Sequence, residues 1–205
     1  MESPRLVESR YFNGVPPAWF KGYRWIKRRE LADITTVVAH QTATPIGVTK
    51  QLLAAHDGDL LAARTTRLTG SGVKRRGVPY QSVFSPEDDA TIMLWHPKFH
   101  SHHGHGSNSY SVGFAYIGKF PGDVVSERLR DHFGALLDRW LSMGVGLRYI
   151  EAHRQHSDQR GNDPGPELWG TLVEVAASRG IEPRPLFTTG TGRSIPPTWS
   201  IAETA

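Results

Sequence analysis

The sequence of 205 residues contains no cysteine. This absence excludes a disulfide framework and a thiolate zinc site, so histidine and carboxylate side chains must hold any metal ion. It does not indicate the compartment in which the protein works. The length is sufficient for one domain of about 150 residues with a sizeable core, flanked by tails.

Long apolar runs are lacking as well. The first five residues are polar, and no apolar stretch follows that could serve as a signal peptide or cross a membrane. We therefore expect synthesis in the cytoplasm without a signal peptide, and no membrane insertion. Export, where it occurs, requires another route.

Dense basic tracts are also missing, although the net charge is +4. The longest basic runs have three residues, at 27–29 and 74–76, and we interpret them as solvated faces. A basic balance favours polyanionic partners such as nucleic acid, anionic membranes or bacterial wall polymers. Because the sequence has no recognition motif and no basic stripe, we expect no nucleic-acid binding.

The apolar patterns predict an α/β fold. Short β-branched or alternating segments predict strands, at 35–40, 78–84, 90–95, 111–117 and 147–152. Helical spacing predicts helices, at 49–64, 124–144 (with Ser126 as N-cap) and 167–179. This order predicts a mixed central sheet of about five strands with helices packed on its faces. Residues 1–33 are interpreted as an aromatic-rich arm that packs on the domain at 34–180, and residues 181–205 as an irregular tail.

Three side chains have the spacing of a metal site. His40 and His153 stand at the ends of predicted strands, and Asp163 follows ten residues after His153 in an Asp-Pro-Gly turn. A catalytic zinc ion needs three protein ligands and one open position. Each residue alone also fits a structural role, since such histidines are commonly hydrogen-bonded and Asp-Pro-Gly commonly opens a turn. A rival metal site is the histidine-rich tract at 96–105, with His96, His100, His102, His103 and His105.

Four motifs carry a resemblance to a known family. They are His-Gln-Thr-Ala at 40–43, Pro-Tyr-Gln-Ser-Val-Phe at 79–84, Asn-Ser-Tyr-Ser-Val-Gly at 108–113 with His103 before it, and the segment from Ala152-His153 to Asp163-Pro164-Gly165. Together, over residues 34–180, they resemble the zinc-dependent N-acetylmuramoyl-L-alanine amidases. Phage-type endolysins and peptidoglycan recognition proteins share that fold.

The resemblance implies a zinc amidase domain with His40, His153 and Asp163 as metal ligands. The implied reaction is hydrolysis of the amide between N-acetylmuramic acid and L-alanine in bacterial peptidoglycan, with a zinc-acidified water as nucleophile. Tyr80 falls on the catalytic tyrosine of the family. His103 is a candidate donor to the leaving amine, and Arg160 is a candidate source of positive charge.

Two positions depart from the family pattern. Ala115 stands where some members carry a glutamate, and Gly161 where others carry a lysine. The identity of the general acid therefore stays open, and a non-catalytic module that holds peptidoglycan is the alternative function. We expect a monomer acting on the cell wall as an endolysin or an injected enzyme, with cytoplasmic muropeptide recycling as another setting.

Overall fold

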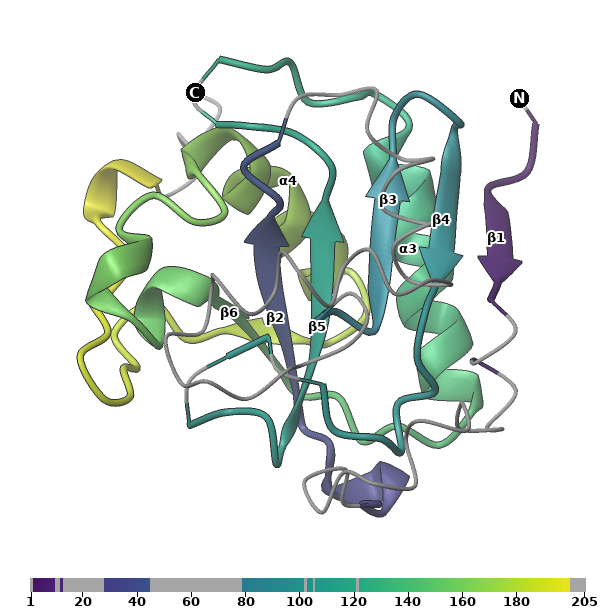
Figure 1. The fold of residues 1–205 in the computed structure, drawn as a ribbon, viewed down its shortest axis with the longest axis horizontal. Coiled ribbons are helices and arrows are strands. Elements are labelled where there is room, and N and C mark those ends of the chain that lie inside the picture. The colour runs from purple at the N-terminus through teal and green to yellow at the C-terminus, as the bar shows by residue number, and fades with distance from the viewer. Residues whose placement is uncertain are drawn as a thin grey trace, which may run out of the picture.

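A mixed sheet of seven strands forms the centre of this computed structural model (Figure 1). The structure describes residues 2–9, 12, 28–44, 79–101, 103–104, 106–120 and 122–199. The strand order is β1-β4-β3-β5-β2-β6-β7. Strands β1 and β4 are parallel to each other and antiparallel to the rest of the sheet. The predicted α/β fold with a mixed sheet is confirmed, with seven strands in place of about five.

Each predicted strand segment contains or overlaps one strand of the sheet. The strands are β1 (Arg5–Glu8), β2 (Thr36–Gln41), β3 (Ser82–Ser85), β4 (Ala90–Met93), β5 (Ser111–Tyr116), β6 (Tyr149–Ala152) and β7 (Glu182–Pro183). Strand β3 begins at Ser82 because the chain still bends at Pro79, which has no N–H for a ladder. The predicted hairpin is present as the antiparallel pair β3 and β4.

The two strands that the patterns did not predict lie at the edges of the sheet. Strand β1 has four residues and pairs with β4, whereas β7 has two and pairs with β6. Both are too short to show a period of two in the sequence. They fall inside the segments interpreted as an arm and a tail, and the division into 1–33, 34–180 and 181–205 stays a prediction.

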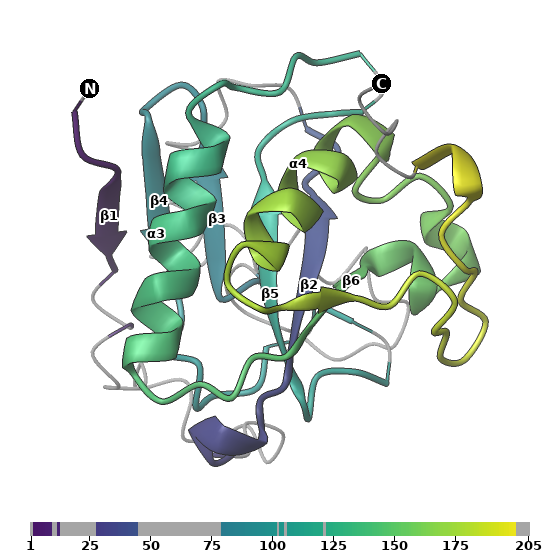
Figure 2. The ribbon, with the colours of Figure 1, turned by 180° about the vertical axis from the view of Figure 1, so that it is seen from behind.

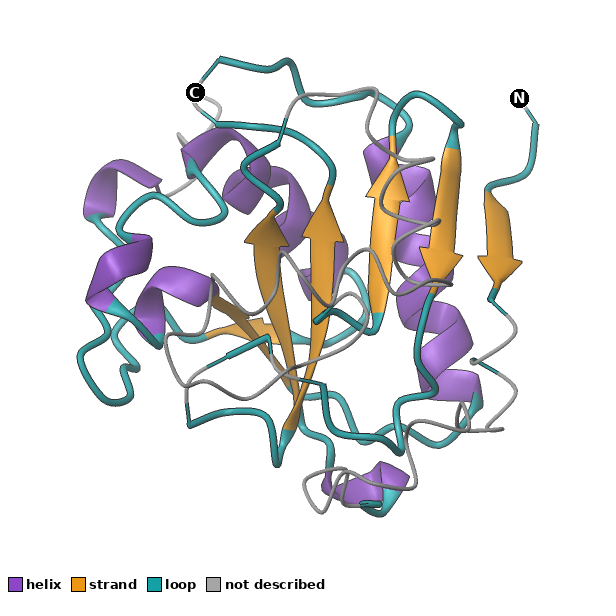
Figure 3. Cartoon of the chain, in the orientation of Figure 1, coloured by secondary structure: helices purple, strands orange, loops and turns teal. Residues whose placement is uncertain are grey.

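Two long helices pack on one face of the sheet (Figure 2, Figure 3). They are α3 (Leu129–Ser142) and α4 (Pro166–Ala177). The predicted helix at 124–144 starts later because Ser126 is in a preceding turn, where its N–H donates to Tyr116 Oη at 3.0 Å and its Oγ accepts from Arg128 N at 3.3 Å. The helix predicted at 49–64 lies outside the described residues. No helix in the described ranges combines the length and apolarity needed to cross a membrane.

Alternation along the strands sends side chains to two different faces. Residues 37 and 39 of β2, 112, 114 and 116 of β5, and 150 and 152 of β6 join the core beneath α3 and α4. The intervening residues, including His40 and Ala115, point to the opposite face because successive strand side chains alternate. One face of the sheet is therefore the helix-covered core, and the other is available for a site.

Short 3₁₀ helices occupy the connections. They are η2 (Leu31–Asp33), η3 (His153–Gln155), η4 (Asp158–Arg160) and η5 (Pro197–Trp199). Helices η3 and η4 lie in the loop between β6 and α4, which starts at His153 and contains Asp163. That loop is thus partly helical.

Candidate metal centre

His40, His153 and Asp163 converge on the face of the sheet opposite the helices. His40 lies near the carboxyl end of β2, and His153 follows directly after the neighbouring parallel strand β6. Nδ1 of His153 lies 2.8 Å from Oδ2 of Asp163, and Nδ1 of His40 lies 4.0 Å from the same oxygen. One ligand atom from each residue falls within 4.8 Å of the others, and no other such group of three occurs among the described residues.

This donor set fits a zinc ion. Zinc–nitrogen and zinc–oxygen bonds of about 2.0–2.2 Å in tetrahedral geometry separate the ligand atoms by roughly 3.4 Å. The observed separations of 2.8 and 4.0 Å lie on either side of that value. In addition, Nδ1 of His40 is buried and has no hydrogen-bond partner. A lone pair that is buried without a partner is unfavourable unless it binds something, and a metal ion would satisfy it.

The site is closed on one side and open on the other. The side chain of His40 is fully buried, whereas 13% of His153 and 11% of Asp163 remain exposed. Burial lowers the pKa of His40, and the neighbouring charges of His153 and His103 lower it further. His40 is therefore a neutral imidazole, which is the form that binds a metal ion.

The backbone of β2 orients the carboxylate of Asp163. The N–H of Gln41 donates to Oδ1 of Asp163 at 2.8 Å, which leaves Oδ2 facing the two histidines. The turn itself depends on Gly165, whose φ of +103° is strained for other residues. A Cβ at Gly165 would also lie 2.8 Å from Cβ of Phe120.

The side chain of Gln41 ties together two loops that meet at the site. Its amide accepts from Phe120 N at 2.5 Å and donates to Phe120 O at 3.0 Å and Asn162 O at 2.9 Å. Gln41 lies within the His-Gln-Thr-Ala motif, but the motif assigns it no role. The signal available in the sequence was a polar side chain directly after His40, at the end of an otherwise apolar strand.

Tyr80 and Arg160 lie near the cluster and differ in burial. The ring centroid of Tyr80 is 4.9 Å from that of His40. Burial raises the pKa of Tyr80, the charge of Asp163 raises it further, and the charge of Arg160 lowers it. Tyr80 is thus a neutral phenol beside the candidate ligands. Arg160 is exposed on η4, and its positive charge acts on both His40 and Tyr80.

His103 lies behind His40. Its Nδ1 is 3.2 Å from Nε2 of His40, and only 3% of the residue is exposed. Burial lowers the pKa of His103, and the charge of Arg29 lowers it further. The structure therefore brings all six residues singled out from the sequence into one region, with His103 on its inner side and Arg160 on its outer side.

The other described histidines of the histidine-rich tract, His96 and His100, are not part of this group of three. Nδ1 of His96 accepts from Lys98 N at 3.2 Å, and its ring lies 5.6 Å from that of Phe12 between centroids. His102 and His105 lie outside the described residues. His156, which follows the tract much later in the chain, is paired with Glu151 at 3.0 Å and is not one of the three candidate ligands. Among the described residues, the metal site interpretation thus falls on His40, His153 and Asp163.

Comparison with known proteins identifies the fold. No family model and no curated protein sequence matches the chain. Several solved structures do match the chain. Bumblebee PGRP-SA, a peptidoglycan recognition protein, superposes with a TM-score of 0.60 at 18% identity, covering 91% of this chain and 99% of its own. The amidase LysC from Clostridium intestinale URNW gives a TM-score of 0.57 at 17% identity, covering 88% of this chain and all 100% of its own.

A phage enzyme shows the same likeness. The Ph2119 endolysin from a Thermus scotoductus bacteriophage has a TM-score of 0.55 at 17% identity, covering 83% of this chain and 98% of its own. This chain has the fold of the peptidoglycan recognition proteins and amidase endolysins. The fold expected from the four motifs is thereby confirmed.

Within this peptidoglycan-recognition fold, two positions near the cluster carry no ionisable side chain. Ala115 pairs in register with His40 between β5 and β2 and is fully buried, so an apolar methyl group lies on the floor of the site. Gly161 contributes its carbonyl, which accepts from Nη1 of Arg154 at 2.5 Å. Neither position supplies a proton donor.

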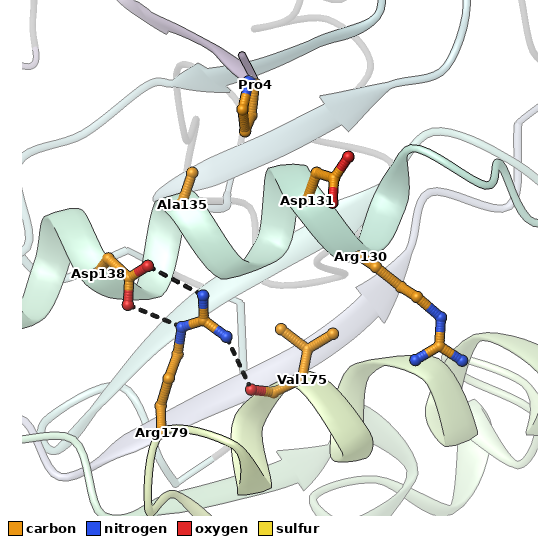
Figure 4. Close-up of a pocket in the computed structure, with 7 residues that line it drawn as sticks. All are labelled: Pro4, Arg130, Asp131, Ala135, Asp138, Val175 and Arg179. Atoms are coloured by element: carbon orange, nitrogen blue, oxygen red, sulfur yellow. Dashed lines mark hydrogen bonds and ion pairs between the residues drawn. The ribbon is translucent and has the colours of Figure 1, made fainter. Parts of the chain in front are cut away.

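A hollow lies beside α3 and α4 on the helical side of the fold (Figure 4), and none of its lining residues belongs to the cluster. Its charged side chains are already paired: Arg179 binds Asp138 through two contacts of 2.7 and 2.9 Å, and Arg130 pairs with Glu174. The lining residues are Pro4, Arg130, Asp131, Ala135, Asp138, Val175 and Arg179. Since these charges satisfy one another, the hollow is a poor candidate for the functional site.

Proposed function

We propose that this chain is a zinc-dependent amidase that hydrolyses the bond between N-acetylmuramic acid and L-alanine in peptidoglycan. The observation that carries the proposal is the convergence of His40, His153 and Asp163 around a buried, unpartnered Nδ1 of His40. Two solved structures of this fold are described as N-acetylmuramoyl-L-alanine amidases, which supports the assignment. Hydrolytic zinc sites use three protein ligands and keep a fourth position for water.

The ligand residues are prepared for this chemistry by their surroundings. When bound, zinc would lower the pKa of a water molecule towards about 7 and polarise the substrate carbonyl. His40 is held neutral by burial, and the N–H of Gln41 turns Oδ2 of Asp163 towards the histidines. The partial exposure of His153 and Asp163 leaves an approach for the substrate from their side.

Tyr80 is the residue we assign to the developing oxyanion. Because its pKa is raised, its hydroxyl stays protonated and can donate a hydrogen bond to the carbonyl oxygen as negative charge accumulates there. Arg160 adds positive charge at the exposed rim of the site. A guanidinium does not release its proton near neutral pH, so Arg160 would attract and stabilise anionic groups and would not act as a general acid.

The proposed substrate is the polymeric wall. A net charge of +4 favours an anionic polymer over small soluble muropeptides. We therefore assign the activity to cell-wall lysis after release or injection, with muropeptide recycling as the other setting. The L-alanine amino groups released from intact sacculi, compared with those released from purified soluble muropeptides, would separate the two settings.

The decisive experiment measures zinc content and bond cleavage on the same samples. Purified sacculi are digested with zinc-loaded protein, and newly freed L-alanine amino groups are counted with and without a chelator. We expect about one zinc per chain and steady release in the wild type, and loss of both in His153→Ala and Asp163→Asn. His96→Ala, on the histidine-rich tract but outside the cluster, is the matched control. Full zinc loading with no release of L-alanine amines would overturn the proposal.

A second function is favoured by one observation. Ala115 and Gly161 leave two family positions without an ionisable group, which suits a module that holds peptidoglycan without cutting it. Sedimentation with sacculi tests this function in the wild type and in a His40→Ala, Asp163→Ala double variant. Wall binding that persists in the double variant, combined with no cleavage by the wild type, would establish recognition in place of hydrolysis.

A further inference from the structure

The hydrogen bonds around His103 define where its ring proton lies. Nε2 of His103 is 3.3 Å from the carbonyl oxygen of Ser111 and 3.2 Å from Ser111 Oγ. A carbonyl can only accept. Ser111 Oγ uses its own proton to donate to Ser107 O at 2.7 Å, so it also accepts from His103. Nε2 of His103 therefore carries the hydrogen.

The position of this hydrogen on His103 determines the tautomer of His40. A neutral imidazole with its hydrogen on Nε2 has a free lone pair on Nδ1. Nδ1 of His103 lies 3.2 Å from Nε2 of His40, so His40 must donate there. The hydrogen of His40 is then on Nε2, and its Nδ1 presents a lone pair towards Asp163, where no hydrogen-bond partner meets it.

We propose that His103 is a positioning residue that locks His40 in the tautomer whose Nδ1 binds the metal ion. The inference rests on the proposed function for the identity of the metal, but it concerns the apo protein as well. Outer partners of metal-bound histidines are commonly carboxylates or backbone carbonyls. Here the imidazole of His103 accepts a hydrogen bond from His40 and donates one to the carbonyl of Ser111. His103 thereby takes a role different from the proton donor that the sequence suggested.

Burial supports this role for His103. Only 3% of the residue is exposed, and the fully buried ring of His40 lies on its site side. The two rings meet edge to face, with an interplanar angle of 88° and centroids 5.3 Å apart. A substrate at the exposed side of His153 and Asp163 would not touch His103. The ring of His103 is therefore placed to hold the metal ligand His40 and does not reach a leaving amine.

The surrounding chain is built to keep His103 in this place. Gly113 has no side chain, and a Cβ there would lie 2.6 Å from Cγ of His103, so the ring packs directly on the strand. The buried guanidinium of Arg29 donates to Ser111 O at 2.6 Å and Asn108 O at 2.5 Å. Arg29 thereby anchors the carbonyl that receives the His103 proton.

The first test reads the tautomers directly. Long-range ¹H–¹⁵N correlation spectra of the zinc-free wild type distinguish a protonated Nε2 from a protonated Nδ1 in each histidine. We expect both His40 and His103 to carry hydrogen on Nε2. A spectrum with His40 protonated on Nδ1 would overturn the inference without bearing on whether the protein cleaves peptidoglycan.

The second test compares two substitutions at the same position. His103→Phe keeps a planar ring but removes the acceptor, whereas His103→Asn can place its Oδ1 near the position of Nδ1. We expect chelator competition to show zinc binding weakened about 10- to 100-fold in His103→Phe, with recovery in His103→Asn. His96→Phe, in the same tract but outside the cluster, should bind zinc as the wild type does.

The outcomes separate this inference from the proposed function. Unchanged zinc affinity and an unchanged His40 tautomer in His103→Phe, with a fall in turnover alone, would restore the proton-donor role and overturn ours. A wild type that binds zinc with the expected tautomers but releases no L-alanine amines would overturn the amidase and leave the inference standing. If His103→Phe does not fold, the wild-type spectra and His103→Asn still decide.

Discussion

The phenol of Tyr80 lies beside a ring that we assign to the metal, with centroids 4.9 Å apart. Removing one preorganised donor to an oxyanion typically lowers turnover by about 10²- to 10³-fold. We expect Tyr80→Phe to lower kcat on sacculi by that order. Zinc content should not change, because the hydroxyl is not among the three ligand groups.

Zinc content and kcat must be measured on the same preparation of Tyr80→Phe. A parallel loss of both would show that Tyr80 acts through the metal site and not on the oxyanion. An unchanged kcat would mean that the residue is a packed strand tyrosine, and the oxyanion would need another donor.

The ring of His103 packs directly against the backbone of Gly113. A Cβ at Gly113 would meet Cγ and Cβ of His103 at 2.6 and 2.8 Å, so the ring must shift. Overpacking of this kind destabilises proteins by about 1–3 kcal/mol. We expect Gly113→Ala to lower the free energy of unfolding by that amount and to weaken zinc binding, as measured by denaturant titration and chelator competition.

Gly161 provides the matched control for Gly113→Ala. A Cβ there would have Asp158 O at 4.0 Å as its nearest neighbour, and its φ of −50° suits any residue. Gly161→Ala should therefore leave stability and zinc binding close to those of the wild type. Equal effects of the two substitutions would show that the close approach to His103 is not what Gly113 provides.

Local sequence patterns pointed to the three candidate ligands but not to the residues that orient them. His40 and His153 stand at strand ends and Asp163 in a turn, so each is marked by local pattern. Gln41 and Arg29 act on backbone groups far along the chain, such as Phe120 O, 79 residues away, and Ser111 O, 82 residues away. No local pattern encodes such contacts.

Helix α3 holds a buried histidine against the sheet. His132 Nε2 lies 3.1 Å from Asp89 Oδ1, Nδ1 lies 3.5 Å from Thr91 Oγ1, and the ring lies 4.9 Å from that of Phe84 between centroids. Burial lowers the pKa of His132 below 6.5, although the carboxylate of Asp89 raises it in part. The folded state therefore resists protonation that the unfolded chain accepts.

Because the folded and unfolded states differ in their affinity for this proton, the stability of the protein depends on pH. As pH falls below about 6.5, the unfolded chain binds a proton at His132 that the folded protein does not, so stability falls, by at most about 1.4 kcal/mol per pH unit for one group. We expect His132→Gln, which can still donate to Asp89, to lose less stability than the wild type between pH 7.5 and 5.5. Denaturant unfolding at both pH values measures this. Equal losses in the two proteins would contradict the prediction.

The sequence predicted a strand or helix wherever the segment was long enough to show alternation or helical spacing of apolar residues. Five strands and both described long helices fall in predicted segments, because burial of one face imposes alternation or helical spacing on them. Strands β1 and β7 were not predicted, since four and two residues at a sheet edge carry no period. The start of α3 was placed too early because a turn through Ser126 imitates the first helical turn.

The C-terminal segment braces the loop that carries His153 and Asp163. The side chain of Gln155 donates to Arg184 O at 2.6 Å and Phe187 O at 2.7 Å, and Arg193 N donates to Arg154 O at 2.8 Å. The segment was interpreted as an irregular tail from its prolines. Its irregular backbone is instead tied to the loop by hydrogen bonds that only the folded chain brings together.

Gln155 is the residue through which this brace can be tested. Besides its two contacts with the C-terminal segment, its Oε1 accepts from Ala152 N at 2.7 Å, at the end of β6. Gln155→Leu would remove the partner of the buried N–H of Ala152 and of the half-buried carbonyls of Arg184 and Phe187. A buried polar group left unsatisfied costs about 1–3 kcal/mol. We expect a lower free energy of unfolding and weaker zinc binding, measured by denaturant titration and chelator competition.

Gln159→Leu is the control, because Gln159 lies on the same loop but is exposed on η4. It should change stability by no more than about 0.5 kcal/mol and leave zinc binding as it is. A stable Gln155→Leu protein with wild-type zinc affinity would show that the loop holds His153 and Asp163 without the C-terminal segment. Loss of zinc affinity in Gln155→Leu alone would make that segment part of the metal site's scaffold, since the hydrogen bonds of its described residues reach the loop at residues 154–158.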